Sequence, residues 1–233
     1  RIISIQILQN RDYSLSDRLI ILGMFCNKTN DYVAASKTEE IPQLIAMYTK
    51  IIENGSIKES LLDIPVYNSI QMLLIKELVD VKVSRGLNSI RFQECFSELI
   101  KGIQYSDEAT VEENTNRYLE AYNLYFLPFI QDHEYIFENY LVNYVYNNLF
   151  PLGGTTIFEE YRSLIMHFAM IKLHLIGMAG FHKENFSLDH VIKLIQSFCK
   201  TIEHDSIYLN DTKKLLEFNG YTSMAYMSIL IKN

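Results

Sequence analysis

Hydrophobic residues recur at intervals of three and four along residues 133–181, in two stretches separated by a proline and two glycines. The first stretch, residues 134–150, places its large apolar side chains on one face, which is the spacing of an amphipathic helix. Pro151 disfavours the helical conformation in the residue before it, and Gly153 and Gly154 allow the chain to reverse. The pattern therefore predicts the first arm and the turn of a helical hairpin.

The second stretch predicts a helix from about Ile157 to Phe181, with Thr156 and Glu159 at the spacing of a capping box. Apolar residues surround this helix on nearly every side, which is typical of a helix buried in a bundle. Charged residues and histidines interrupt the apolar run before it reaches the roughly 18 residues of a membrane span. We therefore expect a core helix and no membrane association.

Helical periodicity and capping residues continue through the rest of the chain, and no sustained two-residue alternation bounded by hairpin turns appears. The pattern predicts one long helix from Thr110 to about Leu127, and residues 221–231 fit a helix or a strand. Gly177 and Gly180 would let a neighbouring helix approach closely. The predicted fold is all-α, an irregular bundle of about eight to ten helices around a buried hairpin at 133–181.

The composition favours one compact domain over residues 1–233. Apolar residues make up 48% of the chain, which suffices for a substantial core, and the four prolines form no linker. The three cysteines are far apart and have neither disulfide nor zinc-site spacing, so we expect no metal site. They are interpreted as small buried hydrophobic residues, which fits a reducing cytoplasm.

The formal net charge is −7, and residues 107–138 account for all of it, with eight acidic residues against Arg117 alone. An acidic chain without basic clusters is a poor nucleic-acid binder. Two interpretations of the acidic segment remain open. It is a solvated face that aids solubility, or it attracts a lysine-bearing partner.

The usual catalytic and nucleotide-binding motifs are missing, so candidate site residues come from polar groups on apolar helices. Glu138, Asn139 and Asn143, with Tyr140 beside them, are candidates for orienting a lysine ammonium or a polar cofactor. The alternative is a ridge of interhelical hydrogen bonds. Arg162, if buried, needs a carboxylate partner, and we expect that partner to be Glu138.

His167 and His174 are the remaining candidates for binding substrate or cofactor. They lie seven residues apart and therefore project from nearly the same side of a mostly apolar helix. A buried histidine can titrate near neutrality or bind a ligand. The alternative is that neighbouring backbone or side-chain groups satisfy both rings within the core.

Four stretches of the chain resemble the flagellin lysine-N-methylase family, and they occur in the family's order. One of them is ENYLVNYVYNNLFP, residues 138–151. The others are IQILQNRDYSLSDRLIILGMFC (5–26), YRSLIMHFAMIKLHLIGMAGFH (161–182) and VIKLIQSFCKTIEH (191–204). They are apolar helix patterns that cover most of the chain, and no catalytic residue of the family maps onto a numbered position.

The resemblance implies an enzyme that methylates lysine ε-amino groups of flagellin, with S-adenosylmethionine as the methyl donor. Family members also carry a cysteine-rich cluster near the N-terminus, associated with an iron–sulfur centre, which this sequence lacks. We therefore expect the chain to be the C-terminal helical part of a longer protein. Its expected role is substrate recognition and part of the active site; the alternative is a non-catalytic module that binds flagellin or associates with itself.

Overall fold

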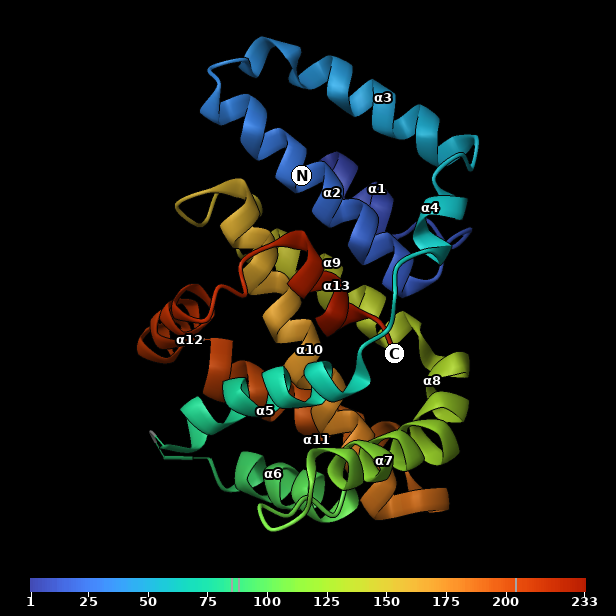
Figure 1. Cartoon of the computed structure of the whole chain (residues 1–233), viewed down its shortest axis with the longest axis vertical. Coiled ribbons are helices and arrows are strands. Elements are labelled where there is room, and N and C mark those ends of the chain that lie inside the picture. The colour runs from blue at the N-terminus through green and yellow to red at the C-terminus, as the bar shows by residue number, and fades with distance from the viewer. Residues whose placement is uncertain (85, 88, 204) are drawn as a thin grey trace. The chain divides into compact units, whose positions relative to one another are not determined.

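The protein is all-helical in the computed structural model, which describes residues 1–84, 86–87, 89–203 and 205–233. These residues form thirteen α-helices and no strand (Figure 1). The helices are α1 (Ile2–Leu8), α2 (Leu15–Ala34), α3 (Ile41–Glu53), α4 (Lys58–Leu62), α5 (Asn68–Ser84), α6 (Ile90–Gly102), α7 (Val111–Ala121), α8 (Leu127–His133), α9 (Tyr135–Asn147), α10 (Ile157–His182), α11 (Leu188–Phe198), α12 (Ser206–Phe218) and α13 (Met224–Ile231). The all-α prediction is confirmed.

The chain packs into two compact units. Unit 1 comprises Arg1–Val66, Tyr135–Ile165 and Thr222–Asn233, and unit 2 comprises Tyr67–Glu134 and Met166–Tyr221. Helix α10 contributes its first nine residues, 157–165, to unit 1 and residues 166–182 to unit 2. The expectation of a single domain over residues 1–233 stays a prediction.

The core of unit 1 forms where α2 packs against α1 and α13. Leu19 and Leu22 of α2 are fully buried, and so are Ile20 and Ile21 between them, so this part of the helix is enclosed on every side. The hydroxyl of Tyr161, at the start of α10, donates a hydrogen bond to the backbone carbonyl of Leu19 at 3.0 Å. The ring of Tyr161 fills the space beside Gly23 that a side chain would otherwise need.

Unit 2 is held together by a close crossing of α6 and α10. A Cβ atom on Gly102 would overlap the carbonyl of Gly177, and one on Gly180 would lie 2.7 Å from the carbonyl oxygen of Gly102. The prediction that glycines near the end of α10 admit a neighbouring helix is therefore confirmed. Nearby, Tyr118 of α7 donates a buried hydrogen bond of 2.9 Å to Gln71 of α5.

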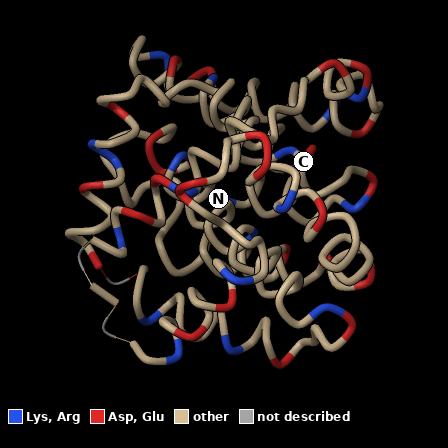
Figure 2. Tube along the Cα trace, turned by 60° about the horizontal axis from the view of Figure 1, so that its bottom comes forward, with Lys and Arg blue, Asp and Glu red and all other residues tan. Residues whose placement is uncertain are grey.

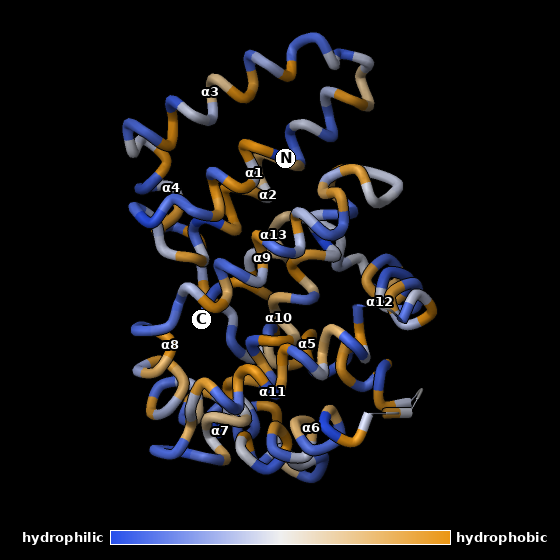
Figure 3. Tube along the Cα trace, turned by 180° about the vertical axis from the view of Figure 1, so that it is seen from behind, coloured by the Kyte–Doolittle hydropathy of each residue, from blue (hydrophilic) through white to orange (hydrophobic). Residues whose placement is uncertain are grey.

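Helix α10 is the most apolar long helix of the described chain (Figure 3). Residues 157–185 are long and apolar enough to cross a membrane, yet 89% of their most apolar window is buried inside the protein. Burial in a protein core explains this composition as well as a membrane would. The predicted core helix, with limits within one residue of those expected, is confirmed.

The helix count exceeds the predicted eight to ten because short elements escaped the sequence pattern. Helices α1 and α4 have only seven and five residues, too few to show a clear 3.6-residue period. The predicted long helix after Thr110 is interrupted by a π-helical segment at Tyr122–Phe126, and α8 then begins with Pro128 in its first turn. The ambiguous C-terminal segment is helix α13.

Candidate functional site

Glu138, the first predicted site residue, is a buried carboxylate in unit 1. Its Oε2 atom accepts a hydrogen bond from Nη1 of Arg18 at 2.8 Å, and its Oε1 atom accepts one from Nη2 of Arg11 at 2.9 Å. The hydrogen bonds from Arg11 and Arg18 outweigh the effect of burial and lower the pKa of this carboxyl. The expected pairing of Glu138 with Arg162 is wrong, because the two N-terminal arginines take both carboxylate oxygens.

The other predicted residues of this group do not converge on Glu138. Asn139 and Asn143 are exposed on α9, so they form no buried polar ridge, whereas Tyr140 is buried in the core. Arg162 is half-buried on α10. Helix α9 has one buried face and one exposed face. Tyr140 lies on the buried face, where it packs in the core, and the two asparagines lie on the exposed face.

His167 and His174 lie inside unit 2 and are almost completely buried. Burial lowers the pKa of each ring to about 4, so both are neutral at pH 7. The Nδ1 atom of His174 bonds the backbone carbonyl of Met170 at 2.7 Å, and the ring packs 5.3 Å from that of Phe92. Burial and these ring contacts are typical of histidines that pack within a protein core. His204, the last histidine of the sequence, lies outside the described residues.

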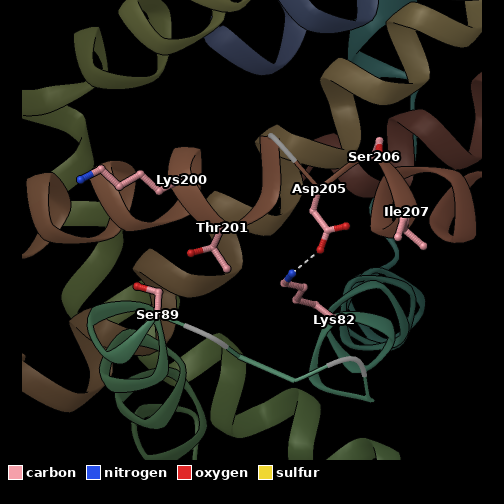
Figure 4. A pocket seen from close by; sticks show the side chains of 7 residues that line it. All are labelled: Lys82, Ser89, Lys200, Thr201, Asp205, Ser206 and Ile207. Carbon is pink, nitrogen blue, oxygen red and sulfur yellow. Dashed lines mark hydrogen bonds and ion pairs between the residues drawn. The ribbon is translucent and has the colours of Figure 1, made fainter.

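The sequence analysis did not predict a cavity of about 500 Å³ that lies in unit 2. Figure 4 shows its lining side chains, which come from α5, the N-cap of α6, the π-helical segment Cys199–Glu203 and the start of α12. The lining consists of two lysines, one acid, three hydroxyl-bearing residues and one isoleucine: Lys82, Lys200, Asp205, Ser89, Thr201, Ser206 and Ile207.

An ion pair between Lys82 and Asp205 dominates one wall of this cavity (Figure 4). The two charged atoms are 2.5 Å apart, and only 6% of the Lys82 side chain is exposed. Asp205 also caps α12, since its Oδ1 atom accepts a hydrogen bond from the backbone N–H of Tyr208 at 2.9 Å. The buried hydroxyl of Tyr208 donates to the carbonyl of Leu78, so α5 and α12 are tied together beneath the ion pair.

Of the two residues in this ion pair, only Asp205 could have been placed from the sequence. Asp205 precedes an amphipathic segment and is a favoured N-cap residue, so its position at a helix start could have been predicted. Its pairing with Lys82, 123 residues earlier in the chain, depends on how α5 and α12 pack, which no local pattern encodes.

The chemistry of the cavity suits a polar or anionic ligand better than the expected methyl donor. Lys82 and Lys200 give two positive charges against the one negative charge of Asp205, and that acid is already neutralised by Lys82. S-adenosylmethionine carries a positive sulfonium, which this balance repels, and its adenine would find only Ile207 as an apolar contact. The residues of this cavity do not fit the donor.

The cysteines and histidines do not form a metal site within the described residues. Cys26 lies in unit 1, whereas Cys95 and Cys199 lie in unit 2. Burial raises the pKa of the Cys95 thiol, and burial with the nearby Glu203 raises that of Cys199 to about 12, which keeps both thiols protonated. The iron–sulfur centre implied by the resemblance does not fit these thiols.

Comparison with known proteins gives one decisive match. No curated protein and no solved structure matches the chain. Residues 1–230, which are almost the whole sequence, match the FliB lysine N-methylase C-terminal domain. The match agrees with the four stretches in which the sequence resembles flagellin lysine-N-methylases. The chain therefore belongs to the FliB lysine N-methylase family and corresponds to its C-terminal domain.

Proposed function

We propose that this chain is the flagellin-recognising part of a protein lysine N-methylase. The observation that carries the proposal is the match of residues 1–230 to the C-terminal domain of the FliB lysine N-methylases. The complete enzyme would transfer methyl groups from S-adenosylmethionine to lysine ε-amino groups of flagellin, and it would act in the cytoplasm. The domain described here would bind and orient the substrate.

The charge of the chain supports a lysine-bearing partner. Six of the eight acidic residues in the segment 107–138 are exposed: Asp107, Glu108, Glu112, Glu113, Glu120 and Asp132. All six belong to unit 2, and acidic and basic residues are otherwise interspersed along the chain (Figure 2). A net-negative surface accelerates encounter with a positively charged surface and repels negatively charged competitors. Glu138 does not contribute, since it is buried and paired with arginines.

Substrate positioning is a substantial task in amine methylation. The attacking ε-amino group must lose its proton and point its lone pair along the line of the transferred methyl group. Carboxylate and amide oxygens that accept hydrogen bonds from the amine hold that orientation, and a nearby base accepts the proton. The charge and lining of the unit 2 cavity argue against donor binding in that cavity.

The test compares this chain alone with the same chain joined to the family's upstream cysteine-rich region. Flagellin binding is measured by calorimetry, and methyl transfer is measured by mass spectrometry of flagellin with S-adenosylmethionine present. We expect the chain alone to bind flagellin without methylating it, and the longer protein to do both. Full methylation by the chain alone would contradict the proposed division of labour, and absence of flagellin binding would contradict recognition.

A second candidate function is a docking module that binds flagellin or another copy of itself and takes no part in methyl transfer. The turn between α9 and α10 favours it, because Leu149 and Leu152 are 58% and 79% exposed there. Exposed apolar side chains close together in a loop suit a protein interface. A longer protein in which Leu149→Ser and Leu152→Ser abolish self-association but leave methylation unchanged would assign this loop to assembly.

A further inference from the structure

We propose that a groove between α1 and α3 is a binding slot for one lysine side chain of the substrate protein. The proposal rests on the proposed function for naming flagellin as the source of that lysine. The groove belongs entirely to unit 1 and has a volume of about 180 Å³. Ligand sites for drug-sized molecules occupy roughly 300–1,000 Å³, so this groove fits a single long side chain.

The walls of the groove are apolar and already fixed in the core. Ile3 and Ile7 of α1 face Ile52 of α3 across it, and each is less than 9% exposed. The hydroxyl of Tyr13 donates a hydrogen bond of 2.8 Å to the carbonyl of Ile52, which anchors the last turn of α3. A lysine stem of four methylene groups gains favourable burial against such walls, and no rearrangement of the protein is required.

The rim of the groove carries the acceptors that an ammonium group needs. The carboxylate of Glu53, the hydroxyl of Thr49 and the side-chain amide of Gln6 line it. An ammonium has three N–H donors and no acceptor, so the three side-chain oxygen groups among the lining residues match it. A compact ammonium fits a slot of this size better than the wide, planar guanidinium of arginine.

The carboxylate of Glu53 lies in an unfavourable electrostatic environment, and a bound cation would stabilise it. It occupies the C-terminal residue of α3, where the partial negative charge of the helix end disfavours a carboxylate and favours a cation. The carboxylate of Glu53 makes no ion pair or hydrogen bond with any described residue, although the exposed Lys50 lies on the same turn. An incoming lysine would therefore meet an unneutralised carboxylate.

The direct test uses the full chain and two small probes, Nα-acetyl-lysine methylamide and its norleucine analogue, which lacks the ammonium. Methyl NMR spectra report on Ile3, Ile7 and Ile52. We expect the lysine probe to shift these three signals at millimolar concentration and the norleucine probe to shift them far less. Glu53→Gln should abolish the difference between the probes. Equal shifts by both probes, or none by either, would overturn the lysine slot whatever flagellin does.

A second experiment measures flagellin binding with native flagellin and with flagellin whose lysines are acetylated. We expect Glu53→Gln to weaken binding of native flagellin about two- to fivefold, as for a partly exposed ion pair, and to leave binding of acetylated flagellin unchanged. Glu59→Gln on α4 removes another exposed acid, which lies outside the groove, and is the matched control. An equal effect of Glu53→Gln on both flagellins would contradict the slot.

The two experiments separate the two proposals. Failure of the wild-type chain to bind flagellin, with the lysine probe still shifting the groove signals, would refute flagellin recognition and leave the slot intact. Flagellin binding that is indifferent to both Glu53→Gln and acetylation would support recognition and refute the slot. Because Glu53 is exposed, its substitution does not threaten folding, and a thermal melt verifies this.

Discussion

Arg18 and Glu138 form a buried ion pair between residues 120 positions apart in the chain, with Nη1 and Oε2 separated by 2.8 Å. Only 1% of the arginine side chain and 6% of the glutamate side chain are exposed. Nη1 of Arg18 also donates to the carbonyl of Leu8 at 2.8 Å, at the end of α1. The guanidinium therefore links α1, α2 and α9 within unit 1.

Removal of either partner should destabilise the protein strongly. Arg18→Ala leaves a buried carboxylate without its inner partner, and Glu138→Gln leaves a buried guanidinium uncompensated. We expect each to lower the free energy of unfolding by about 3–5 kcal/mol in urea titrations. Arg11→Ala is the control, because Arg11 binds the same carboxylate but is 71% exposed, and it should cost at most about 1 kcal/mol. Equal losses for Arg11→Ala and Arg18→Ala would refute this assignment.

The buried histidines should make the fold acid-sensitive. The pKa of His174 is about 4 in the folded protein and 6.5 in the unfolded chain, so the unfolded state binds more protons between these values. Its neutral form contributes stability fully above pH 6.5, and that contribution is lost as the pH falls toward 4. The loss amounts to roughly 3 kcal/mol.

The variant His174→Asn tests this contribution by removing the titrating ring. Its free energy of unfolding should fall less steeply between pH 6.5 and pH 4 than that of the unmodified protein, because one proton fewer is taken up on unfolding. Urea titrations at several pH values measure both slopes. Identical slopes would show that His174 does not titrate differently in the two states.

Lys172 of α10 is a lysine within the core of unit 2, and its removal should stabilise the protein at neutral pH. Burial lowers the pKa of its amine from 10.5 to about 7, so the unfolded state binds more protons between these values and stability rises with pH there. We expect Lys172→Met to raise the free energy of unfolding at pH 7 by about 1–4 kcal/mol. The gain should shrink as the pH approaches 10.5.

The exposed Lys214 of α12 provides the matched control for this prediction. Lys214→Met removes the same charge from the surface of the same unit and should change stability by less than about 0.5 kcal/mol. A destabilised Lys172→Met variant at pH 7 would mean that the amine makes favourable contacts that outweigh its desolvation.

The crossing of α6 and α10 should tolerate no side chain at Gly177. A Cβ atom there would lie 2.7 Å from both the Cα and the carbonyl oxygen of Leu99, so the two helix backbones would have to separate. We expect Gly177→Ala to lower the free energy of unfolding by about 1–3 kcal/mol despite the better helix propensity of alanine. Asn143→Ala, at an exposed position of α9, should instead be neutral or slightly stabilising. Stabilisation by Gly177→Ala would refute the close crossing.

The sequence by itself determined the all-α class and the limits of the central helix α10, because these depend on interactions within a few residues. The apolar period of α10 and the helix start at Thr110 are local signals, and the structure confirms both, with Thr110 and Glu113 forming a capping box at that start. The family was also recognisable, since it is carried by the order of such patterns along the chain.

Only the tertiary structure decided which polar groups meet. Glu138 was expected to pair with Arg162, but its pairing with Arg18 depends on how α2 packs against α9. The pairing of Lys82 with Asp205 and the groove that ends at Glu53 likewise join side chains from distant segments. Periodicity fixes the face on which a side chain lies, whereas the neighbour on the other side is set by packing between helices, which a local pattern does not encode.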